Sequence, residues 1–553
     1  NPLVRRTALY SVGLWRDKDA LPRLSRFLSA SPHEARLAAE AMGRIGEPSH
    51  APYLVAALAR TRDRALQHSM IYALIEIGSM RALERGMLST NDRSVAAVAI
   101  AAEQIDPTSM SPDKVIPWLN NASPELRAAA NWILPRHPEW EDELATYFRG
   151  YLETPPTRAA EYAVNRDLLA TLARQEEIRR LLAETVLAAD LSDASRQLAL
   201  EAMRDSSLNE LPALWVDALT ILLVSEHRTL TPAAIEVLQS KTPPKDLVLP
   251  LRGALRQIAQ NERWDEDVRI RALAAFPAPG GPLDQTLFGL LAIQLAGDAP
   301  LERRAASLKA LGKFELSPTQ LSDLAAAFPH VSPLDALSLL ALYQGQTDPQ
   351  IGKELAAALL KSPALPSLRV DAVKAAFEKF PEEVKRLAAP IYEALQVDPE
   401  KQRMELEALL LQIDGGDPRR GLEVFHSSKA SCGACHQLGY KGGNIGPDLS
   451  RIGAIRSKRD LLEAIAFPNA SFVRSYEPVT VEMKDGVIHS GVRRDESEGE
   501  ITIYKSATEK VRVKLADVEQ IHPSNVSIMP SGLTQQLTIQ ELADLIAFLQ
   551  GAK

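Results

Sequence analysis

Two cysteines and a histidine form a compact motif in the last quarter of the sequence. The chain has 553 residues and two cysteines, Cys432 and Cys435, and His436 follows the second of them directly. This C-x-x-C-H spacing is the attachment signature of c-type haem. Thiols one helical turn apart can form thioethers to the two vinyl groups of one porphyrin, and the imidazole of His436 can then bind the iron. The sequence therefore predicts one covalently bound haem c.

Other uses of the two cysteines fit the sequence less well. A zinc site normally takes four protein ligands, and the motif offers three without a fourth partner at a suitable spacing. A redox-active C-x-x-C of the thioredoxin type follows a strand in an α/β context, which the surrounding sequence does not show. Two cysteines are also too few for a disulfide framework.

The iron needs a second axial ligand, and the downstream sequence offers four candidates: Met483, His489, His522 and Met529. Met529 precedes Pro530 in a loop ahead of the last predicted helix, so its thioether can point at the iron across from the histidine. Met483 lies in a strand-like stretch, where a packing role is the simpler interpretation, and His522 is the main alternative. His/Met ligation fills both axial positions and raises the reduction potential, which favours electron transfer over oxygen or peroxidase chemistry.

Helices are predicted on both sides of the motif. The Gly, Asp and Pro residues at 414–418 mark a boundary, after which Asp417 can cap a helix that starts with Pro418. Ser457 can cap a helix over Lys458–Ala466. Thr538 and Glu541 form a capping box for a final helix that Gly551 can end.

A β-rich insertion is predicted between the motif and Met529. The strand-like runs are Val479 to Met483, 487–492, 500–504, 511–515 and 518–521, and Asp485-Gly486 is a hairpin turn signal. We expect a small antiparallel sheet over about residues 477–522. It can shield a haem edge, bind a partner or be a solvated decoration.

The first four hundred residues read as helical repeats. In the stretch that precedes Gly46, the apolar residues form one helical stripe: Leu37, Ala38, Ala41, Met42 and Ile45. Runs such as Val4-Arg5-Arg6-Thr7-Ala8 recur, and near the N-terminus the units repeat about every 30 residues, as in an α-solenoid. The pattern resembles HEAT-type repeats over most of residues 1–410. We find no catalytic constellation there, so the expected role is a scaffold that docks a partner.

Charge and hydropathy exclude two kinds of binding. Lys and Arg number 63 against 71 Asp and Glu, a formal net charge of −8, which argues against nucleic acid as a partner. No apolar run reaches the ~18 residues that a membrane helix requires.

The C-terminal region resembles a class I cytochrome c. The resemblance rests on Gly421-x-x-x-Phe425, the C-x-x-C-H motif, Gly446-Pro447-Asp448-Leu449, Ile452-Gly453 and Met529-Pro530. It implies that Pro447 packs on the proximal side of the haem, where the neighbouring backbone accepts the histidine N–H. It also implies that the last helix crosses the first one at Gly421 and Phe425.

A longer string that includes Tyr476-Glu477 and Met529-Pro530-Ser531-Gly532-Leu533 resembles a haem-binding domain abundant in Planctomycetes and Verrucomicrobia. In that family the haem domain commonly follows helical repeats, which follow a β-propeller resembling quinone-type sugar dehydrogenases. This chain begins in repeat sequence without an initiator Met, so we expect a fragment, a processed product or a member without the propeller. The resemblance implies export, to the periplasm or an equivalent compartment.

Together these observations predict a mainly α protein. We expect a HEAT-like α-solenoid over residues 1–412 and an all-α class I cytochrome c domain with a small inserted antiparallel sheet over 416–553. The predicted site consists of Cys432, Cys435, His436, Pro447 and Met529, with His436 and Met529 on the iron. The expected role is electron transfer with a redox partner, a dehydrogenase domain or subunit, rather than catalysis. The alternatives are a scaffold whose haem is structural or sensory, and the electron-accepting part of a sugar or alcohol dehydrogenase.

Overall fold

The computed structural model describes residues 1–154, 159–296, 299–395, 398–473, 475–485, 487–497, 499–524 and 526–553. The chain divides into two compact units, Asn1–Leu247 and Val248–Lys553. The break between the units therefore lies inside the repeats. The boundary expected at 412–416 falls within the second unit and stays a prediction.

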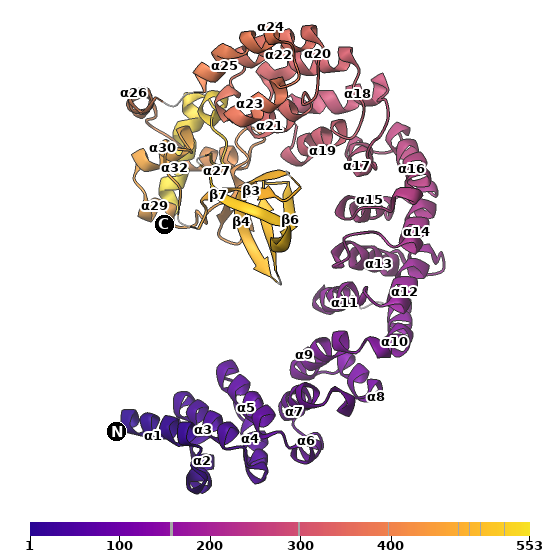
Figure 1. Cartoon of the computed structure of the whole chain (residues 1–553), viewed down its shortest axis with the longest axis vertical. Helices are drawn as coiled ribbons and strands as arrows, with labels where there is room; N and C mark the ends of the chain where they lie inside the picture. Colours follow the sequence, from indigo (N-terminus) through magenta and orange to yellow (C-terminus); the bar gives the residue numbers. More distant parts are fainter. Residues whose placement is uncertain are drawn as a thin grey trace. The chain divides into compact units, whose positions relative to one another are not determined.

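The first unit consists of short helices joined by tight turns (Figure 1). Its helices are α1 (Pro2–Trp15), α2 (Leu21–Phe27), α3 (Pro32–Ile45), α4 (Ala51–Leu58), α5 (Arg64–Ile77), α6 (Met80–Gly86), α7 (Asp92–Ile105), α8 (Pro112–Val115), α9 (Pro124–Ile133), α10 (Glu141–Glu153), α11 (Ala159–Leu172), α12 (Glu176–Leu187), α13 (Asp193–Asp205), α14 (Ala213–Val224) and α15 (Thr231–Ser240). Alternate helices stack on one another, as α1, α3, α5 and α7 do in turn. The predicted stop at Gly46 is confirmed, since Gly46 caps α3 with a left-handed φ of 73°.

The second unit continues the repeats. The repeat helices are α16 (Val248–Gln260), α17 (Glu266–Ala275), α18 (Gln285–Ala292), α19 (Leu301–Leu311), α20 (Pro318–Ala327), α21 (Pro333–Ala341), α22 (Pro349–Lys361), α23 (Val370–Phe377), α24 (Glu382–Leu387), α25 (Ala389–Ala394) and α26 (Pro399–Gln412). Stacking of alternate helices persists, with α17 on α19 and α20 on α22. The prediction of a mainly helical solenoid is thus confirmed.

Among the described residues of the second unit, six helices and two short strands form the region of the C-x-x-C-H motif. They are α27 (Pro418–His426), α28 (Cys432–Cys435), β1 (Gln437–Leu438), β2 (Lys441–Gly442), α29 (Ile452–Ile455), α30 (Lys458–Ala466), α31 (Leu533–Gln536) and α32 (Ile539–Gly551). The caps expected at Asp417, Ser457 and Thr538 all accept the predicted backbone N–H bonds. The stretch 431–449 contains the α28 turn and the short β1–β2 ladder.

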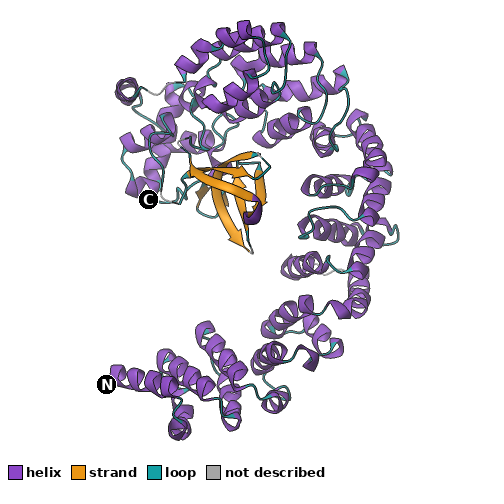
Figure 2. Ribbon diagram, in the orientation of Figure 1, coloured by secondary structure: helices purple, strands orange, loops and turns teal. Residues whose placement is uncertain are grey.

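The inserted antiparallel sheet is present between α30 and α31 (Figure 2). Its strands are β3 (Pro478–Met483), β4 (Ile488–Ser497), β5 (Glu500–Tyr504), β6 (Lys510–Lys514) and β7 (Val518–Pro523). They lie in the order β6-β5-β4-β3-β7, with every neighbouring pair antiparallel. Val481, Ile501, Ile503 and Val513 form a buried cluster of the sheet's own. Gly486, half of the predicted hairpin turn, lies outside the described residues.

A separate apolar core lies beneath the motif, and we call it the C-terminal apolar cluster. It consists of Leu406, Ile413, Val424, Phe425, Ala430, Leu461, Leu462, Ile465, Leu533, Leu537, Leu542, Ala543, Leu545, Ile546 and Leu549. Helices α27, α30, α31 and α32 contribute most of these side chains. Leu406 comes from α26, which the sequence assigns to the solenoid, so the last repeat helix shares its core with the motif region.

Candidate functional site

The two cysteines lie on one helical turn. Cys432 starts α28, and the backbone N–H of His436 donates to the carbonyl of Cys432 at 2.9 Å. Ser431 precedes the turn in a left-handed conformation with φ of 46°, which few side chains tolerate. The chain is therefore bent sharply to present Cys432 and Cys435 as neighbours.

Both thiols are held in their protonated form by the surrounding protein. Burial raises the pKa of Cys432 to about 12, with a further contribution from nearby Cys435. Burial alone raises the pKa of Cys435 to about 11. Because the thiolate is the reactive and metal-binding form, neither side chain is suited to act as a thiolate at neutral pH. Among the described residues, no group of three or more His, Cys, Asp or Glu side chains is placed to hold a metal ion.

His436 is fixed in one tautomer. Its Nδ1 lies 2.8 Å from the carbonyl oxygen of Pro447. A carbonyl can only accept, so Nδ1 carries the proton and the lone pair is on Nε2. Burial lowers the pKa of the imidazole, although the bond to Pro447 opposes this shift. The result is a neutral imidazole oriented by its backbone partner, the state in which histidine binds metals.

A glycine makes the approach of the Pro447 loop possible. A Cβ placed on Gly446 would lie 2.7 Å from Cε1 and 2.8 Å from Nδ1 of His436, so a side chain does not fit there. The N–H of Gly446 also donates to the carbonyl of Cys435 at 2.9 Å. The Gly446-Pro447 segment thus packs directly against the imidazole and holds it by backbone contacts.

Met529 and Cys432 contact the same core. Both side chains are partly buried, and both pack against the C-terminal apolar cluster. The Met529 loop is anchored at two points, because the N–H of Ser527 donates to Oδ1 of Asn469 at 2.7 Å and the N–H of Met529 donates to Oγ of Ser527 at 3.0 Å. Met529 and Cys432 thus border one apolar cluster.

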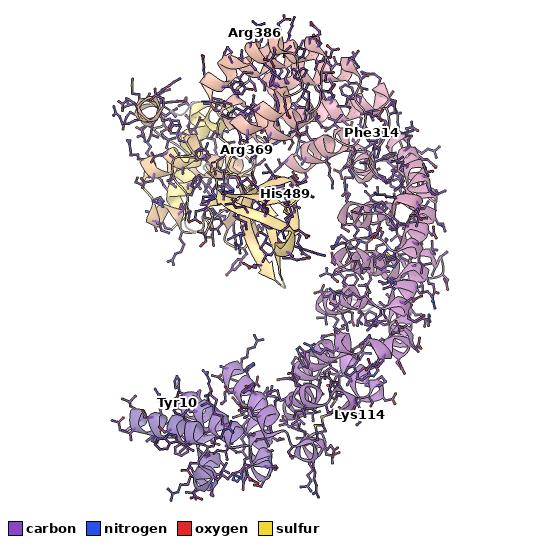
Figure 3. The ribbon with its side chains drawn as sticks, viewed as in Figure 1. Tyr10, Lys114, Phe314, Arg369, Arg386 and His489 are labelled. Atoms are coloured by element: carbon purple, nitrogen blue, oxygen red, sulfur yellow. The ribbon has the colours of Figure 1, made fainter. Side chains whose placement is uncertain are left out.

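The other three candidates for the second axial ligand lie on the sheet. Met483 packs against the sheet's own cluster. His522 on β7 has its Nε2 3.7 Å from Oε1 of Glu482. His489 lies on β4 opposite Val481 of β3, and its side chain is labelled at the sheet in Figure 3. The packing role expected for Met483 is thus the one the structure shows.

The first and last helices of the region cross at close range. A Cβ on Gly421 of α27 would lie 2.0 Å from the carbonyl oxygen of Asp544 on α32, so only glycine fits the crossing. The buried carboxylate of Asp544 accepts from Nε of Arg420 at 2.7 Å and from the N–H of Asp417 at 2.7 Å. Arg420 is the main reason that the pKa of Asp544 falls to about 2. The predicted crossing at Gly421 agrees with this arrangement.

One contact that the sequence did not indicate ties the sheet to the motif. NH2 of Arg494 on β4 donates to the carbonyl of Asn444 at 2.6 Å and to the hydroxyl of Tyr476 at 3.1 Å. The guanidinium also lies 4.3 Å from the centre of the Tyr476 ring, a cation–π contact. Asn444 stands two residues before Gly446, so Arg494 anchors the segment that supports His436. In the sequence, Arg494 is one of several charged residues just after a predicted strand, and nothing marks it as a contact of the motif.

Comparison with known proteins identifies repeats at the start of the chain. A family model for HEAT repeats matches residues 1–75. None of the curated proteins matches the sequence. Among the described residues, none of the helices has the length and apolarity to span a membrane.

Several solved structures are similar in part. The karyopherin Kap121p, bound to the extreme C-terminus of the protein phosphatase Cdc14p, is 14% identical over 68% of this chain and 49% of its own, with a TM-score of 0.38. Importin beta is 13% identical over 75% of this chain and 61% of its own, also with a TM-score of 0.38. This chain spans less than two thirds of the length of either. HEAT repeats are thus identified over residues 1–75, and haem attachment at Cys432 and Cys435 stays a prediction.

Proposed function

We propose that this protein is a c-type cytochrome that transfers electrons through one haem bound to Cys432, Cys435, His436 and Met529. The observation that carries the proposal is the bond from His436 Nδ1–H to the carbonyl of Pro447, in a histidine that directly follows two thiols on one turn. A histidine that binds a metal typically donates its other N–H to such an acceptor.

The residues present fit a haem c. The donor set is a neutral imidazole and a thioether, which is one of the axial pairs of cytochromes c. The thiols are neighbours and protonated, and Cys432 and Met529 both pack against one apolar cluster. When bound, the haem would supply a one-electron redox centre.

The chain's own residues would set the properties of that centre. Pro447 holds His436 in the tautomer whose Nε2 can bind iron. The bond from the N–H of Met529 to Oγ of Ser527 supports the loop from which the Met529 thioether would bind the iron. Axial methionine raises the reduction potential, and an apolar surrounding keeps water away and adds to that effect. His436 and Met529 would together supply both protein ligands of the iron, and such a haem would serve electron transfer.

We further propose that residues 416–553 are an all-α class I cytochrome c domain with the inserted sheet, and that the protein is exported. The α27–α32 crossing at Gly421 and the Pro447 contact are two features that this family implies. Export is supported by the motif alone, because haem c attachment in the resembling family takes place after transport to the periplasm or an equivalent compartment.

The solenoid is the proposed docking surface for a redox partner. Stacked repeats expose an extended surface that is suited to binding proteins, and HEAT repeats match residues 1–75. We propose that the partner is a dehydrogenase. The HEAT match equally favours a second candidate function, a protein-interaction scaffold in which the haem is structural or sensory. Rapid reduction by a candidate dehydrogenase supports the first function, and haem-independent binding without reduction supports the second.

An absorption spectrum tests the proposal. The protein, produced together with a c-type cytochrome maturation system, should show a c-type α band after reduction and should exclude carbon monoxide. A chain without that band would refute the haem. A chain with the band that binds carbon monoxide readily would refute the Met529 ligation.

A further inference from the structure

One turn of the solenoid contacts two loops of the proposed haem site: the loop that precedes Cys432 and the loop that contains Met529. The turn Val331–Asp335 includes the first residues of α21, and Arg304 reaches it from α19. We call Arg304, Val331, Pro333 and Asp335 the solenoid bracket. Figure 1 shows α19 and α21 beside the C-terminal helices of the same unit.

The bracket holds the cysteine loop through a buried ion pair. Arg304 is fully buried, and its Nε donates to Oδ2 of Asp335 at 2.5 Å. NH1 of Arg304 donates to the carbonyl of Ala299 at 2.5 Å and also reaches the carbonyl oxygen of Ser428 at 3.3 Å. The same carbonyl accepts from Oγ of Ser431, the left-handed residue directly before Cys432. The ion pair is thus linked by two hydrogen bonds to the bend that presents Cys432.

The same turn holds the methionine loop. Nε2 of Gln536 on α31 donates to the carbonyl of Val331 at 3.4 Å. Gly532, three residues after Met529, has φ of 90° and lies so close to the repeats that a Cβ there would be 3.1 Å from the carbonyl oxygen of Pro363 and 3.5 Å from Cγ of Pro333. The Met529 loop is therefore packed against the residues next to Asp335.

Burial of the Arg304–Asp335 ion pair costs free energy, which a structural role of the pair has to offset. Removing two charges from water costs several kcal/mol per ion, and NH2 of Arg304 is left without a hydrogen-bond partner. Apolar residues could fill the same space at similar or better stability. What an apolar pair could not do is donate to the Ser428 carbonyl and fix the register between the two loops.

We infer that the solenoid bracket is a positioning device that sets the separation between the Cys432 loop and the Met529 loop and thereby secures the iron–methionine bond. The inference rests on the proposed function. Arg304, Asp335 and Gln536 are positioning residues that do not touch the haem iron themselves. The repeats are then a part of the redox site as well as a docking surface.

The test uses the full chain with haem attached and two ways of loosening the bracket. The double variant Arg304→Met/Asp335→Leu removes both charges at once, so that no unpaired charge is buried. Gln536→Ala removes only the bond to Val331. The matched controls are Arg204→Met/Glu236→Leu, which deletes an ion pair of the first unit, and Gln535→Ala, an exposed neighbour on α31.

Four measurements are compared: covalent haem content by mass, the long-wavelength absorption band of methionine-ligated ferric haem, carbon monoxide affinity of the ferrous protein, and hydrogen exchange of residues 529–533. Both bracket variants should keep their haem, lose part of the methionine band and bind carbon monoxide at least about tenfold more tightly, equal to about 1.4 kcal/mol. Exchange at 529–533 should be faster, and the controls should match wild type.

The outcomes separate the two ideas. If the wild-type chain carries no haem, both the proposed function and the role of the solenoid bracket are refuted. A wild-type chain with a methionine-ligated haem, and a folded Gln536→Ala variant with unchanged band, carbon monoxide affinity and exchange, overturns the bracket alone. If the double variant does not fold, Gln536→Ala decides the question.

Discussion

The Nδ1 atom of His436 lies 2.8 Å from the carbonyl oxygen of Pro447, and Gly446 packs against the same imidazole ring. The backbone around Pro447 thus fixes both the tautomer and the orientation of the ring.

Gly446→Ala should disturb the imidazole without changing a single hydrogen-bonding group. The new Cβ would lie 2.7 Å from Cε1 of His436, so the ring or the loop has to move. We expect a lower haem content and a shifted reduction potential, measured by spectroscopy and redox titration. Gly551→Ala is the control, since a Cβ there meets nothing within 4 Å. Identical potentials for the Gly446 variant and wild type would mean that the loop does not hold the ring.

Met529→Ala should open one face of the haem. Loss of the thioether should lower the reduction potential and permit carbon monoxide to bind, as axial methionine raises the potential of cytochromes c. Met483→Ala is the matched control, because that methionine packs against the cluster of the sheet. If the Met529 variant still excludes carbon monoxide, another residue is the ligand, and His522→Ala is the next variant to measure.

The thiols should react slowly in the folded chain when haem is not attached. Burial raises the pKa of Cys435 to about 11 and that of Cys432 to about 12, so the thiolate fraction at neutral pH is roughly a hundredfold or more below that of a free cysteine. Alkylation followed by mass spectrometry should show this slow rate, increasing with pH. In urea both thiols should react at the ordinary rate. Equal rates in urea and in buffer, with a native circular dichroism spectrum, would contradict the burial.

The crossing of α27 and α32 should depend on pH through Asp544. Arg420 and the N–H of Asp417 hold the pKa of this carboxyl at about 2, below an unfolded value near ~3.9. Its contribution to stability is therefore full above pH ~4 and is lost as the pH falls towards 2. Asp544→Asn should reduce the free energy of unfolding by about 1–2 kcal/mol at neutral pH.

Urea unfolding of wild type and variant from pH 7 down to pH 2 measures this effect. The difference between the two proteins should shrink below pH ~4, because the carboxylate is then protonated first in the unfolded chain and, near pH 2, in the folded chain as well. The control is Asp448→Asn, which removes a carboxylate that bonds only locally, to Ser450. A constant difference between Asp544→Asn and wild type across the whole range would mean that the Arg420 pair does not stabilise the crossing.

The helix caps and the strands could be predicted because they depend on residues that are close together in the sequence. Caps at Asp417, Ser457 and Thr538 depend on side chains that bond to N–H groups two or three residues away, so their pattern is visible in the sequence. The strands of the inserted sheet follow from alternation in the same way.

Apart from the crossing at Gly421, which the family resemblance implied, contacts between distant segments could not be predicted. The bond from Arg304 to Ser428 joins residues 124 positions apart, and the Arg494 anchor joins a strand to a loop 50 positions earlier. Neither residue stands out from the charged residues around it, because each acquires its partner only when the repeats, the sheet and the motif are packed together. The break between the two compact units at Leu247 follows Pro243-Pro244, but prolines recur between the helices of the repeats, so this position does not stand out either.

The mass of the chain produced with a c-type maturation system, measured after extraction with acidified organic solvent, tests covalent haem attachment most directly. The haem mass should stay with the peptide containing Cys432–His436, and Cys432→Ala and Cys435→Ala should each lose one thioether. A chain whose two thiols remain free, or whose haem is extracted by the solvent, would contradict this attachment.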